Sequence, residues 1–529
     1  MDGRRPLISA RHGLVAAAHP LAAQAGARLL ANGGNAFDAA AATAAVLNVV
    51  EPFMSGLAGM GMATCFIAAE QRVRVLDFVT RVPGRFPTGR GEESSRGGFA
   101  CGVPGCLAGW CELVKTHGQK KLMEVFAPAI ALARDGHLVI DHPGATLLQA
   151  IAALRDFPCY ADWCAAYLDE GSGEPGPGFI MRQSALARSL ETIALEGPEY
   201  LYRGELGRRV VAHVEALGGS LTRQDLETAR PHWLDPVAVE YRGLDLHAPP
   251  PPCEAFQFLL TLRLLDGVDF AGMERDGVEH LDAVWRAIRL AAGVRIAHNR
   301  PNATMLAGLL SEPQVAPLRA RLREAAPVEG PTGPGWPQPE DPAKGHTTSF
   351  AVADRHGNVV CVTQSLGGLS GSGVVVPGTG ICLGNFLFWS DLDAQGDQPL
   401  LPGTELTLPL APVLALRQGR PVLALGTPGS HGISQFQTQV LVQHVDFGLD
   451  LQAAIEAPRA RLWDGRRVQA ERRIPPATLE VLRARGHDIE AVPDWSAKLG
   501  GMQGIAIDPA SGVLTGGADP RREGLVAIP

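Results

Sequence analysis

The sequence lacks the patterns that mark several common classes of enzyme. It contains no CxxC pair, no GxxxxGK[ST] phosphate loop, no GxSxG nucleophile elbow and no HExxH zinc motif. A zinc ribbon, a P-loop nucleotide site, a serine-hydrolase site and a zincin site are therefore not predicted. Charged residues are few, at 19% against 46% apolar residues. This balance excludes an intrinsically disordered protein and is typical of a chain that buries a large core.

Positive charge and long apolar runs are also scarce. The 47 Lys and Arg residues are outnumbered by 55 Asp and Glu residues, which gives a net charge of -8 and argues against nucleic acid as a partner. The most apolar stretch, residues 36–50, is interrupted by Asp38 and Asn48 and is shorter than the roughly 20 residues that cross a bilayer. The N-terminus has no apolar segment typical of a signal peptide. We therefore expect a soluble protein with no membrane partner.

The cysteines do not form a recognisable disulfide or metal-binding framework. Their number is odd, and their spacing matches no zinc-ligand pattern. They are Cys65, Cys101, Cys106, Cys111, Cys159, Cys164, Cys253, Cys361 and Cys382. We expect reduced and mostly buried thiols, which favours a cytoplasmic location.

Periodicity and turn residues predict helices in the first half of the chain and strands in the second. Helices are expected from His19 to Ala31 and from Asn35 to Val50, and most of residues 120–323 should be helical. Two paired strands are expected at residues 62–70 and 72–79. Further strands are expected at 349–353, 359–363, 412–416 and 421–425, followed by a helix over 433–446.

The clearest break in the chain is the segment from Pro331 to Gly345. Its fifteen residues include five prolines and three glycines, so it can hold neither a helix nor a central strand. Taken alone, such a segment is interpreted as an interdomain linker. After it come His346, the pair Thr347 and Thr348, and then a predicted strand.

Thr347 is the strongest candidate for a nucleophile. A threonine hydroxyl needs a base to take its proton, and a free α-amino group, with a pKa of about 7.7, can be that base. This chemistry requires the chain to be cut between His346 and Thr347. A Thr-Thr pair is otherwise simply the start of a strand.

A series of sequence blocks, in order along nearly the whole chain, resembles the γ-glutamyltranspeptidase family of N-terminal nucleophile hydrolases. The blocks are Gly33–Ala40, Leu47–Pro52, Pro250–Pro252, Thr347–Thr348 with Asp354 and Gly357–Asn358, Gly371–Gly373, Gly426–Gly429, and Asp446–Gly448 with Ala457–Arg459. The first and last blocks are specific, whereas the proline run alone is not.

The resemblance implies a four-layer αββα sandwich that is made as one precursor and cuts itself before Thr347. Residues 1–346 would then form a large chain and residues 347–529 a small chain, and the two would stay together as a heterodimer. Thr347 would be the nucleophile, and the N–H groups of Gly429 and Ser430 would stabilise the oxyanion. An acyl group would pass from a small-molecule amide to water or an amine, with no cofactor and no metal.

The resemblance also gives Ser365 a role. Family members have a threonine or serine near the new amino group, and the Ser365 hydroxyl would orient that amine through a hydrogen bond. Without the resemblance, Ser365 is a strand-end serine and Gly429 a turn glycine.

The sequence departs from the family where transpeptidases hold the ammonium and carboxylate of a γ-glutamyl group. By block alignment, these positions are Val79, Ser365, Gly367, Phe386, Trp389, Leu408 and Pro409. Only Ser365 keeps polar character, since the expected arginine at position 79 and the expected acid at position 389 are absent. An alignment shift of one or two residues would bring Asp391 or Asp393 into the pocket instead.

Arg81 is the candidate that would replace the missing arginine. It stands in an Arg-x-Pro context, as in family members that resemble oxamate amidohydrolase and cephalosporin acylases. It could hold a substrate carboxylate by a bidentate ion pair. The alternative is a surface arginine with a structural partner.

Three functions remain open at this point. The first is an autoprocessed amidohydrolase or acylase for a non-glutamyl acyl group, with Arg81, Phe386 and Trp389 in its pocket. The second is a true γ-glutamyltransferase or glutathione hydrolase with a rearranged pocket. The third is an unprocessed, non-catalytic binding protein on the same fold.

Overall fold

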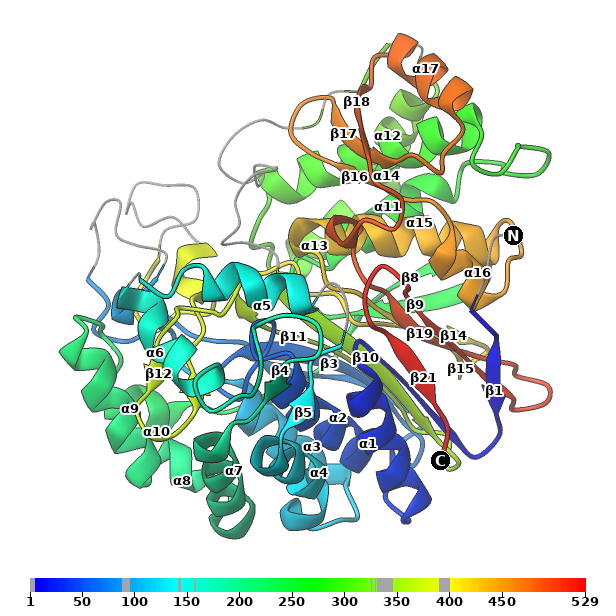
Figure 1. Cartoon of the computed structure of the whole chain (residues 1–529). Coiled ribbons are helices and arrows are strands. Elements are labelled where there is room, and N and C mark those ends of the chain that lie inside the picture. The colour runs from blue at the N-terminus through cyan, green and yellow to red at the C-terminus, as the bar shows by residue number, and fades with distance from the viewer. Residues whose placement is uncertain are drawn as a thin grey trace.

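Two seven-stranded sheets pack face to face and are covered by helices on both outer sides (Figure 1). The computed structural model describes residues 5–87, 96–140, 144–156, 158–324, 326–328, 330, 346–389 and 400–529, with only the backbone of residues 144, 145, 158 and 159. This architecture is the αββα sandwich that the resemblance implied, and the prediction of the fold class is confirmed.

The first sheet carries Thr347. Its strand order is β21 (Leu525–Ala527), β2 (Gly13–Ala17), β10 (His346–Asp354), β11 (Val359–Gly367), β3 (Met60–Ile67), β4 (Arg72–Phe78) and β7 (His232–Leu234). Every described pair in this sheet is antiparallel. β2, β3 and β11 are buried throughout, as is β10 beyond His346, so both faces of the central strands are covered.

The second sheet supplies the loop of the predicted oxyanion hole. Its strand order is β1 (Ile8–Ala10), β20 (Leu514–Ala518), β19 (Gln503–Ile507), β15 (Arg420–Gly426), β14 (Val413–Arg417), β9 (Leu244–Ala248) and β8 (Val237–Tyr241). β15 and β19 pack against β10 of the first sheet. The two central strands that end at the predicted site therefore belong to facing sheets.

One helical layer covers the first sheet. It consists of α1 (Pro20–Ala31), α2 (Ala36–Val50), α3 (Cys106–His117), α4 (Leu122–Asp135) and α7 (Ser184–Glu196). α2 begins with a capping box between Asn35 and Asp38, and all of its residues are buried. A Cβ at Gly26 of α1 would lie 2.4 Å from the Thr43 hydroxyl of α2. Small residues thus let α1 and α2 approach closely.

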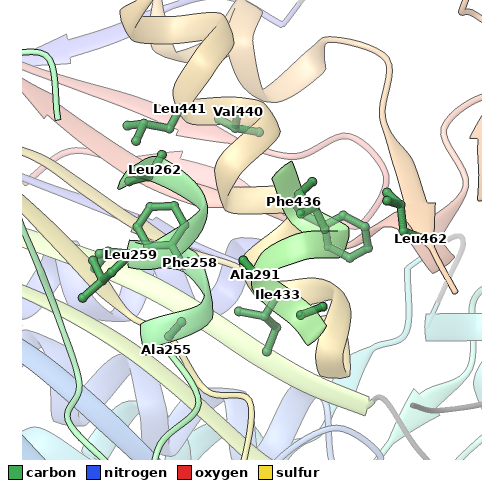
Figure 2. Close-up of a cluster of buried hydrophobic side chains, with 14 of the residues drawn as sticks. Ala255, Phe258, Leu259, Leu262, Ala291, Ile433, Phe436, Val440, Leu441 and Leu462 are labelled. Atoms are coloured by element: carbon green, nitrogen blue, oxygen red, sulfur yellow. The ribbon is translucent and has the colours of Figure 1, made fainter. Parts of the chain in front are cut away.

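A second helical layer covers the other sheet. It contains α11 (Phe256–Leu265), α12 (Val278–Ala297), α15 (Ile433–Val445) and α16 (Leu451–Glu456). Figure 2 shows the core between them, where Phe258 and Leu262 of α11, Ala291 of α12 and Phe436 and Val440 of α15 meet. Burial of such large apolar side chains contributes about 1.5–3 kcal/mol each. This core holds α15, whose N-terminus follows the predicted oxyanion loop.

The remaining elements lie around this sandwich. A three-stranded sheet of β16 (Ala460–Leu462), β17 (Arg467–Glu471) and β18 (Asp488–Val492), together with α17 (Pro476–Ala484), adjoins α12 at the top of Figure 1. The other helices are α5 (Gly144–Ala152), α6 (Pro158–Tyr167), α8 (Glu199–Tyr202), α9 (Glu205–Ala216), α10 (Arg223–Thr228), α13 (Ala303–Leu309) and α14 (Glu312–Leu322). The other strands are β5 (His137–Leu138), β6 (Ile180–Met181), β12 (Val375–Val376) and β13 (Ile381–Cys382).

The predicted helices and strands are confirmed, with three differences. Residues 120–323 are not only helical, because β7, β8 and β9 lie within them and extend both large sheets. The strands β1 and β2 near the N-terminus, the short strands β12 and β13, and the helices and strands after residue 446 were not predicted. β10 begins at His346, so both threonines lie inside the strand and not before it.

The cysteines agree with the sequence-based expectation. All eight whose side chains are described are unpaired and buried, and Cys159 lies outside that set. Within the described ranges, no three His, Cys, Asp or Glu side chains gather in a way that could hold a metal ion. None of the described helices is both long enough and apolar enough to cross a membrane. The cytoplasmic location stays a prediction.

Candidate active site

Thr347 lies at the beginning of a central, buried strand. It stands opposite Ser365 of β11, and the ladder between the two strands is irregular between His346 and Thr347. The residue is only 3% exposed. From Phe350 onward, β10 also pairs with β2. The peptide bond of the predicted cut thus lies at the N-terminal end of a buried central strand, which would hold a new N-terminus in place.

Ser365 contacts the bond that the cut would break. Its hydroxyl donates a hydrogen bond of 2.6 Å to the carbonyl oxygen of His346 and accepts one of 2.9 Å from the Gly367 N–H. A Cβ at Gly59 would lie 2.2 Å from the Ser365 carbonyl oxygen, so only glycine fits beside this strand. In the uncut chain, Ser365 therefore polarises the carbonyl that Thr347 would attack.

Two buried charged residues, not predicted from the sequence, flank the two threonines. Arg522 donates a hydrogen bond of 3.1 Å to the carbonyl oxygen of Thr347, and the Thr348 hydroxyl donates one of 2.7 Å to Glu51. Burial raises the pKa of Glu51, while Thr348 and Arg522 oppose that shift. Burial lowers the pKa of Arg522. These contacts fix the backbone around Thr347 from both sides.

The predicted oxyanion loop begins where the second sheet touches β10. A Cβ at Gly426, the last residue of β15, would lie 2.1 Å from the Ser349 hydroxyl, two residues beyond Thr347. After this contact, the chain passes through Gly429 and Ser430, whose φ angles are 140° and 58°. Positive φ is rare for a residue other than glycine and marks Ser430 as a position held by its surroundings.

A second path links this loop to Thr347. The Thr427 hydroxyl accepts a hydrogen bond of 3.2 Å from the Gly501 N–H. A Cβ at Gly501 would lie 2.5 Å from Cδ of Arg522, the same arginine that holds the Thr347 carbonyl. The structure therefore brings the predicted nucleophile and the predicted oxyanion loop into one region.

The predicted pocket residues fall into two groups. Trp389 reaches the oxyanion loop, since its ring lies 5.9 Å from the ring of His431, with the two planes tilted by 33°. Phe386 and Leu408 are buried in the large core, where the Leu408 carbonyl accepts a hydrogen bond from the Glu254 N–H. Only Trp389 thus comes beside the oxyanion loop in the described contacts. Asp391 and Asp393 lie outside the described residues.

Arg81 stands at the same end of the first sheet as Ser365 but has an internal partner. Its guanidinium lies 2.7 Å from Glu405 and 3.2 Å from the His232 ring. The preceding strand, β4, is three strands away from β10, which corresponds to about 14 Å at a spacing of about 4.8 Å per strand. A substrate carboxylate would compete with Glu405 for this arginine.

The sequence is similar to one known family over almost its whole length. The family model described as "Gamma-glutamyltranspeptidase" matches residues 22–528. Acylase ACY 1 proenzyme of Pseudomonas sp. (strain V22) is 33% identical, over 98% of this chain and 94% of that protein. Glutathione hydrolase proenzyme of Bacillus subtilis (strain 168) is 30% identical, over 97% of this chain and 91% of that protein. The structure of cephalosporin acylase from Bacillus halodurans matches with a TM-score of 0.90 and 31% identity, over 100% of this chain and 98% of that one.

Proposed function

The chain belongs to the γ-glutamyltranspeptidase family and is an autoprocessed amidohydrolase of the N-terminal nucleophile class; from this premise we propose that Thr347 is its nucleophile. The observation that carries the proposal is the geometry of the His346–Thr347 bond. Its carbonyl oxygen accepts a hydrogen bond from the Ser365 hydroxyl, and Thr347 follows on a buried strand. Both sides of the predicted cut are thus held for reaction.

Self-cleavage would use groups that are already in place. The Thr347 hydroxyl attacks the His346 carbonyl carbon, and the hydrogen bond from Ser365 stabilises the negative charge that develops on the oxygen. The C–N bond then breaks as its nitrogen takes the proton that the hydroxyl loses, which leaves an ester on the Thr347 oxygen and a free α-amino group. Water hydrolyses the ester to give residues 1–346 and 347–529.

Turnover of substrate would repeat the same chemistry on an external amide. The α-amino group of Thr347 takes the hydroxyl proton as the oxygen attacks the acyl carbon. The N–H groups of Gly429 and Ser430 stabilise the oxyanion, and the amine leaves with the proton. Water or an acceptor amine then releases the acyl group from Thr347.

The sheet order supports a large and a small chain that stay together. β10 and β11 of the small portion lie between β2 and β3 of the large portion in one hydrogen-bonded sheet. The contact between Thr348 and Glu51 also joins the two portions. Separation would expose buried strand edges, so we propose a stable heterodimer with the boundary at Thr347.

We propose an acyl amide without an α-ammonium group as the substrate class. Trp389 stands beside the oxyanion loop, at a position where an acidic residue is expected for binding a γ-glutamyl ammonium. Glutathione hydrolysis is the second candidate, favoured by the Bacillus subtilis relative, which is 30% identical. A comparison of γ-glutamyl and plain acyl amides separates these two candidates.

The test of the nucleophile uses purified wild-type protein, Thr347→Ala and Thr347→Ser. A denaturing gel with N-terminal sequencing should show a small chain that starts at Thr347 in the wild type, and one uncut, inactive chain for Thr347→Ala. Thr347→Ser should still be cut, since it keeps a hydroxyl. After rapid mixing with an acyl-p-nitroanilide, mass spectrometry should find the acyl group on the small chain. A wild-type chain that stays whole and still turns over substrate would overturn the assignment.

A further inference from the structure

A buried carboxylate lies between the oxyanion loop and the second helical layer. Glu254 is 2% exposed, and one of its oxygens is 2.7 Å from the guanidinium of Arg295 on α12. Its other oxygen is 3.3 Å from Nε2 of His431, the residue directly after Ser430. Burial alone would raise the pKa of Glu254, but Arg295 and His431 hold the pKa down to about 2. Glu254 is therefore a buried anion that contacts both Arg295 and His431.

The backbone that His431 follows is in an uncommon conformation. Ser430 has a φ of 58°, in the left-handed region that non-glycine residues seldom adopt. On one side, the turn is held by the hydrogen bond from the Gly432 N–H to the Gly429 carbonyl. The ring of Phe436 packs against Gly429, since a Cβ there would lie 2.6 Å from it. The contact of His431 with Glu254 holds the following residue.

We propose that His431 is a positioning residue, and that its attachment to the Glu254–Arg295 ion pair keeps Ser430 left-handed and its N–H directed at the oxyanion. The inference rests on the proposed function, because it assigns a support to the oxyanion hole named there. His431 acts through the backbone of Ser430. Its Nδ1 also lies 3.4 Å from the Ser430 hydroxyl oxygen. The Glu254 N–H in turn donates a hydrogen bond of 2.9 Å to the Leu408 carbonyl oxygen in the large core.

The two reactions take place at different carbonyl groups, and this difference distinguishes a positioning role of His431 from a purely structural one. Self-cleavage acts on the His346 carbonyl, which Ser365 holds, whereas turnover acts on an external carbonyl at the oxyanion loop. Loss of His431 should therefore slow turnover and leave self-cleavage largely intact. A residue needed only for folding would affect both.

The experiment compares His431→Leu and His431→Gln with the wild type, using the acyl-p-nitroanilide that the wild type hydrolyses fastest. Loss of a whole oxyanion donor lowers kcat by about 100- to 1,000-fold, so a misdirected donor should cost roughly 10- to 100-fold. We expect this loss of kcat for His431→Leu, with KM changed less than about threefold and with normal self-cleavage. His431→Gln keeps an N–H within reach of Glu254 and should retain most of the activity.

A second variant tests the role of the backbone directly. Glycine adopts a positive φ without the cost that a side chain imposes. The double variant His431→Leu with Ser430→Gly should therefore have a kcat roughly fivefold higher than that of His431→Leu alone. The inference is overturned if His431→Leu turns over normally, if it stays uncut, or if Ser430→Gly gives no recovery in the double variant. A wild type that is not cut, or that hydrolyses no amide, would contradict the proposed function instead.

Discussion

The Ser365 hydroxyl donates a hydrogen bond of 2.6 Å to the carbonyl oxygen of His346, the oxygen of the peptide bond that precedes Thr347. Loss of one donor to a developing oxyanion slows such reactions by about 100- to 1,000-fold. We expect Ser365→Ala to slow self-cleavage by a factor in this range, while the protein still folds. The rate is measured from the fraction of uncut chain on denaturing gels over time.

Two controls accompany this prediction. Ser365→Thr keeps a hydroxyl at the same place and should be cut at a rate close to that of the wild type. Ser372 is also buried and donates to a carbonyl oxygen, that of Leu383, so Ser372→Ala removes a comparable bond away from the cut. If Ser372→Ala delays cleavage as much as Ser365→Ala, the delay reflects folding and not the His346 carbonyl.

Arg81 and Glu405 give a paired prediction about substrate charge. If Arg81 binds a substrate carboxylate, Arg81→Ala should raise KM for glutaryl-p-nitroanilide by about tenfold, since the side chain is 36% exposed and its ion pairs are screened. Phenylacetyl-p-nitroanilide should change much less. Glu405→Gln removes the competing carboxylate and should lower KM for the glutaryl compound. An equal loss for both substrates in Arg81→Ala would make Arg81 structural.

His19 predicts how stability depends on pH. Its ring accepts a hydrogen bond from the Leu21 N–H at the start of α1, and burial, followed by the nearby His137, lowers the pKa of His19 to about 3. Below about pH 6.5, His19 binds a proton in the unfolded chain but stays neutral in the folded chain. The free energy of unfolding therefore falls as the pH falls. At pH 5 this single group should cost at most about 2 kcal/mol of unfolding free energy, because the Glu523 carboxylate lies 3.5 Å from the His19 ring and favours its protonated form.

The measurement uses the uncut Thr347→Ala chain, so that unfolding does not separate two chains. His19→Asn keeps an acceptor for the start of α1 but has no proton to bind. Urea unfolding at pH 7 and pH 5 should therefore show a smaller loss of stability in the His19→Asn variant. The same loss in both proteins would mean that His19 is not the titrating group.

The sequence predicted the long, periodic elements because their patterns are local. The capped helix α2 and the strands β10 and β11 lie where periodicity and turn residues placed them. The short strands β7, β8 and β9 were missed within a region expected to be helical, since strands of three to five residues carry little pattern of their own. Their position is set by the sheets they extend.

The buried residues that hold Thr347 and His431 in place could not be predicted from local patterns. Glu51 falls inside the block Leu47–Pro52, but its partner Thr348 is 297 residues away. Arg522 and Glu254 carry no sequence signal, because their roles depend on burial beside Thr347 and His431. Thr347 was already a candidate from its place after the Pro331–Gly345 segment, whereas Gly429 and Ser430 were found only because a family resemblance supplied their roles. All three roles stay predictions.

Two described carboxylates near the pocket, Glu254 and Glu405, already lie against basic side chains. Glu254 already holds Arg295 and His431, and Glu405 holds Arg81. An ammonium placed here would lose water without gaining an anion, and even partial desolvation of an unpaired charge costs several kcal/mol. The substrate should therefore lack the α-ammonium of a γ-glutamyl group.

This expectation is tested by kcat/KM for three p-nitroanilides. The positions aligned with the γ-glutamyl contacts are mostly apolar, namely Phe386, Trp389, Leu408 and Pro409. If about 3 kcal/mol of the desolvation cost is felt, γ-glutamyl-p-nitroanilide should be roughly a hundredfold poorer than the best substrate. Glutaryl-p-nitroanilide differs from it only by the missing ammonium, so this pair isolates the effect of that charge, and the phenylacetyl compound tests whether a carboxylate is wanted at all. Efficient γ-glutamyl turnover would refute the prediction and direct mutagenesis to Asp391 and Asp393, two acids that lie outside the described residues.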